Sequence, residues 1–233
     1  MVESMVTARQ NAFTQEEIDA VYRAIRERRD VRSGYLPRPL DDETLLRLLT
    51  AAHMAPSVGL MQPWRFILVR DAAQRANVHE IFVRAREAAA ELYDGDRREL
   101  YARLKLEALL EAPQQLCVVC DRNSQQGHAL GRHSMPETPA YSVVCAIQNL
   151  WLAARAEGIA VGWVSILDPL AMKKLLRIPS EVQLVAYLCI GYVEEFAPCP
   201  DLERIGWEER TSLRSVLREE FFDRPTKMGE IAR

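Results

Sequence analysis

The sequence lacks a long hydrophobic run, and this absence excludes an integral membrane protein built of helices. A membrane-spanning helix needs about 18 or more consecutive apolar residues, and no stretch of the 233 residues supplies them. Residues 1–13 also contain no apolar core of the kind that a secretory signal peptide carries. We therefore expect a cytoplasmic protein with no membrane partner.

The sequence also has no excess of positive charge and few histidines. Lys and Arg number 30 against 33 Asp and Glu, so the net charge is −3 and no global basic field attracts a nucleic-acid backbone. The four histidines show no ligand spacing with cysteines or carboxylates. We expect neither a nucleic-acid partner nor a bound metal.

Cysteines are few, and their number is odd. The five thiols lie mostly in apolar segments, as buried thiols do in a reducing compartment. Cys117 and Cys120 match the C-x-x-C spacing, but the surrounding run QLCVVC predicts a strand. Because residues three apart on a strand face opposite sides, we do not expect a redox or metal pair here.

No internal repeat, low-complexity segment or linker divides the chain. With 48% hydrophobic residues, the chain can bury a sizeable core. We predict a single domain over 1–233, with a core over 14–195. The remainder, 196–233, carries scattered apolar residues that favour an arm wrapped around a partner subunit.

Apolar periodicity and capping residues predict the order of helices and strands. Thr14 and Glu17 form a capping box, and Asp41 can cap a second helix. The polar stretch 122–137 is a candidate mobile loop. Helices are expected over 15–28, 41–55, 72–93, 97–111, 138–157 and 168–178, and strands over 65–69, 115–121, 159–166 and 182–193.

The stretch Arg28-Arg29-Asp30-Val31-Arg32 places three arginines around one carboxylate. Crowded guanidinium groups are costly unless an anion lies among them, and their planar fork suits phosphate oxygens. We therefore predict a phosphate-binding corner. A solvated charge run at a helix C-terminus accounts equally well for Arg28 and Arg29, but not for Arg32, which lies beyond the turn.

Two further stretches are candidates for ligand contacts. The loop 55–64 is rich in small residues that permit close backbone approach to a ligand, although an ordinary helix-to-strand connector has a similar composition. The third predicted strand ends in Gly162-Trp163-Val164-Ser165. Trp163 is open to a second interpretation, as an aromatic residue of the core.

In this order, the motifs resemble the nitroreductase-like FMN flavoprotein family from about residue 15 to residue 217. The resemblance implies an α+β fold with a mixed, antiparallel-rich central sheet flanked by helices. It also implies an intertwined homodimer with two FMN sites at the subunit interface. It assigns cofactor binding to Arg28, Arg29, Arg32, Pro56, Ser57, Gln62, Trp163, Val164, Ser165 and Arg210.

Asp30 departs from the family's R-R-S-x-R pattern, in which serine is usual. Together with the Ser-Gly-Tyr continuation, the A-P-S-V-G-L-M-Q-P-W loop and G-W-V-S, it resembles the flavin-destructase branch of the family. That branch uses reduced FMN as a substrate with O2 and fragments it to 5,6-dimethylbenzimidazole, the lower ligand of cobalamin. The resemblance implies that Asp30 is a general acid or base near the ribityl chain and that Ser165 positions the flavin by hydrogen bonding.

Two other functions use the same FMN site. An NAD(P)H-dependent nitro- or quinone reductase would need an open flavin face, against which Asp30 and a possible cover from 72–137 both argue. A non-catalytic FMN-binding module would need neither Asp30 nor Ser165. No Gly-rich dinucleotide fingerprint follows a predicted strand, so a separate NAD(P)H:flavin reductase is the expected source of FMNH2.

Overall fold

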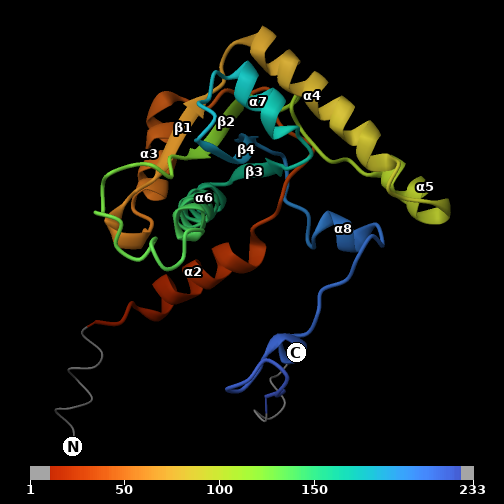
Figure 1. The fold of residues 1–233 in the computed structure, drawn as a ribbon. Helices are drawn as coiled ribbons and strands as arrows, with labels where there is room; N and C mark the ends of the chain where they lie inside the picture. The colour runs from red at the N-terminus through yellow and green to blue at the C-terminus, as the bar shows by residue number, and fades with distance from the viewer. Residues whose placement is uncertain (1–10, 227–233) are drawn as a thin grey trace, which may run out of the picture. The chain divides into compact units, whose positions relative to one another are not determined.

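The computed structural model describes residues 11–226 and divides into two compact units, one ending at Phe196 and the other beginning at Ala197 (Figure 1). The first unit contains the sheet. In its described part, the second unit contains two short helices, α8 (Asp201–Arg204) and α9 (Leu213–Val216). An antiparallel bridge joins Arg218 and Pro225 in this second unit. The predicted wrapping role of this arm stays a prediction.

The first unit is built on a four-stranded sheet with the order β1-β2-β4-β3, in which every neighbouring pair is antiparallel. The predicted strands are confirmed. All residues of β2 are buried, as its continuous apolar run indicates for a strand covered on both faces. The bounds are β1 (Trp64–Leu68), β2 (Gln114–Cys120), β3 (Ile159–Val164) and β4 (Gln183–Tyr192).

Helices cover both faces of the sheet (Figure 1). On one face, α6 (Thr138–Ala156) and α3 (Asp42–His53) share a core with Leu116 and Leu188. On the other face, α4 (Ala72–Ala90) and α7 (Pro169–Leu175) pack with the side chains that alternate to that side. Cys117 belongs to the second core and Cys120 to the first, which confirms that the C-x-x-C thiols face opposite sides.

The predicted N-terminal caps are present at the first two helices. Thr14 and Glu17 form the capping box of α2 (Gln15–Glu27), and the Asp41 carboxylate accepts a hydrogen bond from Thr44 N at 2.7 Å at the start of α3. At α6 the N-cap is Glu137. No helix among residues 11–226 combines the length and apolarity that a bilayer span requires.

The predicted helix over 97–111 is wrong in its second half. The observed helix is α5 (Gly95–Arg103), and the chain is then irregular as far as Pro113. Leu104 and Leu109 are buried in this irregular segment, and Arg86 Nη2 donates to the carbonyl of Leu104 at 3.2 Å. Burying these leucines, with Leu109 in the core beneath the sheet, therefore outweighs the helical propensity of this segment.

The buried thiols should be inert and should make the fold sensitive to alkali. Burial raises the pKa of Cys117 to about 12, of Cys120 to about 11 and of Cys189 to about 12. At pH 8 a thiol reagent should modify only the exposed Cys145 and the half-buried Cys199 of the native protein.

Folding keeps these three thiols protonated, because their pKa values are higher in the folded than in the unfolded state. Their contribution to the free energy of unfolding is therefore fully present below the unfolded-state thiol pKa of about 8.5. It is lost as the pH rises toward the folded-state values. The free energy of unfolding should therefore fall between about pH 9 and pH 12, as denaturant titrations at several pH values would measure. Rapid labelling of all five thiols in the native state at pH 8 would contradict this account.

Candidate active site

The arginine corner, which we define as residues 28–32, leaves the end of α2 and runs alongside β3. Asp30 forms a parallel bridge with Val161, and Val31 N donates to Val161 O at 3.1 Å. The Tyr35 hydroxyl lies 3.1 Å from the carbonyl oxygens of both Val31 and Cys189, so its single proton can be donated to either one, and burial raises the pKa of this tyrosine. The corner is therefore bonded directly to the sheet.

Gly162 permits this close approach of the two backbones. A Cβ atom at this position would lie 2.1 Å from the backbone oxygen of Val31, a distance that real contacts do not reach. We expect Gly162→Ala to lower the free energy of unfolding by about 3 kcal/mol, the cost of forcing atoms into a packed backbone contact. Gly34→Ala is the comparison, because Gly34 has a positive φ of 77° and open space around it.

In the comparison variant, only the left-handed backbone is strained, and we expect a loss of about 1 kcal/mol. Denaturant unfolding of both variants measures the difference. Equal losses would show that the close contact at Val31 contributes nothing.

The Asp30 carboxylate joins the corner to the end of β3. Its Oδ1 accepts a hydrogen bond from Trp163 N at 2.8 Å, and its Oδ2 accepts from Arg32 Nη2 at 2.7 Å and Arg32 Nε at 3.0 Å. The side chains are 27% exposed for Asp30 and 16% exposed for Arg32. Arg32 Nη1 is buried and has no hydrogen-bond partner among the described residues.

The other two arginines of the corner take different positions. Arg29 Nη1 donates to the carbonyls of Arg26 and Arg28 at 2.9 and 2.8 Å, as expected of a cation at a helix C-terminus. The Arg28 guanidinium lies 4.8 Å from the centre of the Trp151 ring. The same indole donates from Nε1 to Arg29 O at 3.1 Å, so Trp151 of α6 supports both arginines.

The end of β3 brings the G-W-V-S residues to the corner. Trp163 is half-buried, with its ring centre 6.3 Å from that of Trp151. Val164 is buried in the core of the opposite face. Ser165 directly follows the strand and is exposed.

The loop over residues 57–62, which we call the Ser57 loop, contains the second group of candidate residues. Ser57 Oγ accepts a hydrogen bond from Gln62 N at 3.1 Å, and Val58 N donates to Ser142 Oγ at 3.1 Å. Trp64 Nε1 donates to His53 Nδ1 at 3.0 Å across the base of the loop. Pro56 is exposed just before it.

Within one chain, the Ser57 loop and the arginine corner contact different parts of α6. The loop bonds to Ser142 near its N-terminus, whereas the corner bonds to Trp151 near its C-terminus. With a rise of about 1.5 Å per residue, these points lie about 14 Å apart along the axis. The structure therefore brings Asp30, Arg32 and Trp163 together, but it does not join them to Ser57 or Gln62.

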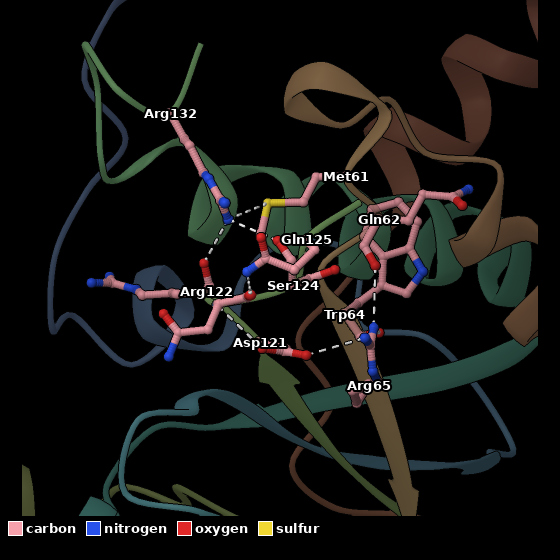
Figure 2. Close-up of polar contacts among 10 residues, drawn as sticks. Met61, Gln62, Trp64, Arg65, Asp121, Arg122, Ser124, Gln125 and Arg132 are labelled. Carbon is pink, nitrogen blue, oxygen red and sulfur yellow. Dashed lines mark hydrogen bonds and ion pairs between the residues drawn. The ribbon is translucent and has the colours of Figure 1, made fainter. Parts of the chain in front are cut away.

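The loop 122–137 packs on the Ser57 loop. A Cβ on Gly127 would lie 2.5 Å from Gly59 O, so the two backbones touch. In Figure 2, Arg132 points toward Met61, and its Nη1 donates to the carbonyls of Arg122 and Ser124 at 2.9 Å each. The sequence suggests that the segment 72–137 could cover the FMN site. Within this segment, the loop 122–137 forms a hydrogen bond to a candidate site residue, from Gln126 to Gln62.

Arg210 lies in the second unit. Its Nε is 3.8 Å from Glu203 Oε2, and both side chains are exposed. Its contribution to a phosphate site stays a prediction. Among residues 11–226, no group of three or more His, Cys, Asp or Glu side chains could hold a metal ion.

The sequence pattern of the nitroreductase family matches residues 25–192, which contain the corner, the Ser57 loop and the end of β3. The chain belongs to the nitroreductase family. Among solved structures, this chain is similar to oxidized iodotyrosine deiodinase bound to FMN and 3-iodo-L-tyrosine. The TM-score is 0.69 at 25% identity, over 87% of this chain and 100% of that one.

Three curated relatives of this chain carry the name 5,6-dimethylbenzimidazole synthase. The protein from Rhodospirillum rubrum is 54% identical over 183 residues, which cover 78% of this chain and 86% of the relative. A protein from Rhodobacter capsulatus is 47% identical over 197 residues, which cover 84% of this chain and 95% of the relative. Both alignments span most of both chains.

Sequence reasoning missed two residues at the candidate site. Trp151 lies in an apolar helix, where a tryptophan indicates core packing, and nothing local shows that an arginine stacks on it. Gln126 lies in a polar loop, yet its Nε2 donates to Leu60 O at 2.9 Å and to Gln62 Oε1 at 3.2 Å. Its only sequence signal is the neighbouring Gly127, which permits the close approach.

Proposed function

We propose that this chain fragments reduced FMN with O2 to give 5,6-dimethylbenzimidazole, the lower ligand of cobalamin. The observation that carries the proposal is the Asp30 carboxylate, placed between the Trp163 N–H and the Arg32 guanidinium. The activity named for the Rhodospirillum and Rhodobacter relatives supports the same conclusion.

The residues present fit a ligand with a phosphate and a hydroxylated chain. Arg32 Nη1 is a buried donor without a partner in the described structure, and an unmet donor of this kind costs about 1–3 kcal/mol until an acceptor reaches it. Arg28 and Arg29 add positive charge nearby, and each charge-assisted bond to phosphate contributes roughly 1.5–3 kcal/mol. FMN in the related deiodinase supports the same ligand here.

Reduced FMN, when bound, supplies the electrons for O2 and the carbon skeleton of the product. Among residues 11–226, Asp30 Oδ1 accepts one hydrogen bond, from Trp163 N, whereas Oδ2 accepts two from Arg32. A carboxylate oxygen has two acceptor sites, so Oδ1 keeps one for a proton. We assign Oδ1 as the atom that takes and returns a proton beside the ribityl chain.

The other residues orient this carboxylate and the ligand. Arg32 and the backbone N–H of Trp163 fix the rotation of Asp30. Ser165, exposed directly beyond the strand, provides a hydroxyl that hydrogen-bonds the flavin. The Trp163 side chain, packed against the core of the α6 face, gives the ring an apolar edge. Val164 can contribute only its backbone, because its side chain is buried in the core of the other face.

We further propose that two copies of the chain complete each site. The apolar stripe of α2 is unburied, with Val21 47%, Tyr22 63% and Ile25 48% exposed, and α6 exposes Tyr141 and Val144. A second copy covering these faces would bring the Ser57 loop of one chain to the corner of the other. We assign Pro56, Ser57 and Gln62 to the partner's FMN, and the arm with Arg210 to the subunit contact.

The electron donor is a separate NAD(P)H:flavin reductase, and the compartment is the cytoplasm, in line with the buried reduced thiols. The test mixes purified protein with FMN and a separate reducing system in air and follows flavin and products by mass spectrometry. Loss of FMN with appearance of 5,6-dimethylbenzimidazole is expected. Intact FMN, with NAD(P)H oxidised by this protein alone and a quinone or nitroaromatic reduced, would overturn the proposal in favour of a reductase.

A further inference from the structure

The Ser57 loop has a strained backbone. Leu60 and Gln62 have positive φ values of 55° and 46°, and Gly59 between Val58 and Leu60 has a φ of 55°. Residues other than glycine rarely adopt this left-handed region and keep it only where surrounding groups hold them. The contacts of Leu60 and Gln62 therefore identify what maintains the loop.

Gln126 contacts both strained residues. Its Nε2 donates to the backbone oxygen of Leu60 at 2.9 Å and to the side-chain Oε1 of Gln62 at 3.2 Å. Gly127, the next residue, touches Gly59, and a Cβ on Gly131 would lie 2.8 Å from Val58 Cγ2. The backbone packing thus places the Gln126 amide against the Ser57 loop.

The bond to Gln62 also sets the direction of its side-chain amide. Oε1 accepts from Gln126, so the NH2 group is the end that remains for a ligand. Gln62 is half-buried, and its Nε2 has no hydrogen-bond partner among residues 11–226.

We propose that Gln126 is a positioning residue for flavin recognition: it turns Gln62 so that its NH2 donates to an acceptor oxygen of FMN. The proposal rests on the function proposed above and adds a residue outside the motifs that resemble the family.

The test reverses this hydrogen-bond polarity. In Gln126→Glu the new carboxylate cannot donate to Gln62 Oε1, and it accepts from Gln62 Nε2, which turns the amide around. FMN affinity, measured by quenching of flavin fluorescence, should fall at least tenfold. Gln126→Ala only frees the amide and should weaken binding about threefold, because the productive orientation stays accessible.

The neighbouring Gln125→Glu is the matched control. Gln125 is exposed in the same loop, and its Nε2 donates to Asn123 O at 2.9 Å within the loop. The same charge change should leave FMN affinity within about twofold, since Gln125 has no bond to Gln62. Equal losses in both variants would overturn the proposal by assigning the effect to charge.

A double-mutant cycle separates positioning from a general loss of loop structure. In a Gln62→Ala background, Gln126→Glu should weaken FMN binding by less than twofold, because the amide that it acts on is gone. With reduced FMN as substrate, Gln126→Glu should raise KM while kcat at saturation stays within about twofold.

A tenfold loss in the Gln62→Ala background, or wild-type affinity in Gln126→Glu, overturns the inference. Wild-type protein that binds FMN but forms no product overturns the proposed function alone, since the binding cycle still reads out Gln126. Wild-type protein that does not bind FMN overturns both.

Discussion

Asp30→Asn is expected to abolish formation of 5,6-dimethylbenzimidazole while FMN affinity stays within about tenfold of the wild type. The amide keeps one oxygen, which can accept from either Trp163 N or Arg32 but not from both. Its NH2 then faces the remaining donor. An amide oxygen is far too weakly basic to take up a proton near neutral pH, so the variant has no proton acceptor and one unmet hydrogen-bond donor at the site.

The unmet donor should also lower stability. A lost hydrogen bond to a charged group costs about 1.5–3 kcal/mol, so the free energy of unfolding should fall by about this amount without loss of the fold. Product formation from FMNH2 in air, FMN binding and denaturant unfolding are measured on the same preparation. Loss of FMN binding together with loss of product would show that Asp30 is structural, and would contradict the assignment of Oδ1 as the proton acceptor.

Asp121 offers a close chemical match for a control. Its Oδ2 accepts from Arg65 Nη2 at 3.2 Å and its Oδ1 from Asn123 N at 3.2 Å, and its side chain is 28% exposed (Figure 2). Asp121→Asn thus removes the same charge from the same kind of arrangement. Product formation should remain within about threefold, because exposed ion pairs contribute little.

The arginine corner shows how far local sequence carries the prediction. The helix-end interpretation accounts for Arg29, which caps carbonyls of α2. It does not account for Arg28, whose guanidinium stacks on the Trp151 indole. Nor does it account for Arg32, which binds Asp30 and whose buried Nη1 has no hydrogen-bond partner among residues 11–226. The position of Arg28 depends on Trp151, and that of the Asp30–Arg32 pair depends on Trp163. Both tryptophans lie far along the chain, so these positions are set by packing and not by the local motif.

The strands could be predicted because strands covered on both faces appear in the sequence as short, continuous apolar runs, and the fully buried β2 is an example. The bond from Trp163 N to Asp30 could not be predicted, because it depends on the approach of Val31 to Gly162. The contact of Gln126 with Leu60 could not be predicted either, because nothing in the sequence around a polar loop residue shows which distant backbone it contacts. The same limit applies to 104–112, where burial against the sheet overrides helix propensity.

Complementation between two inactive chains should restore activity if each site is shared. One chain carries Asp30→Asn, and the other carries Ser57→Ala with Gln62→Ala, which removes the ligand contacts of the Ser57 loop. In a heterodimer, one site receives both lesions and the other receives none. Co-expression with two different tags, followed by tandem purification, should give heterodimers with about half of the wild-type activity.

The control pair places both lesions in the arginine corner. Heterodimers of Asp30→Asn with Arg32→Met have one damaged corner at each site, so they should stay inactive whichever chain provides the Ser57 loop. Recovery in the first pair and not in the second follows only if the loop and the corner of one site come from different chains. Activity no higher than that of the parents in both pairs would instead place the loop and the corner of one chain on the same flavin. The distance of about 14 Å along α6 would then have to be spanned by a single ligand.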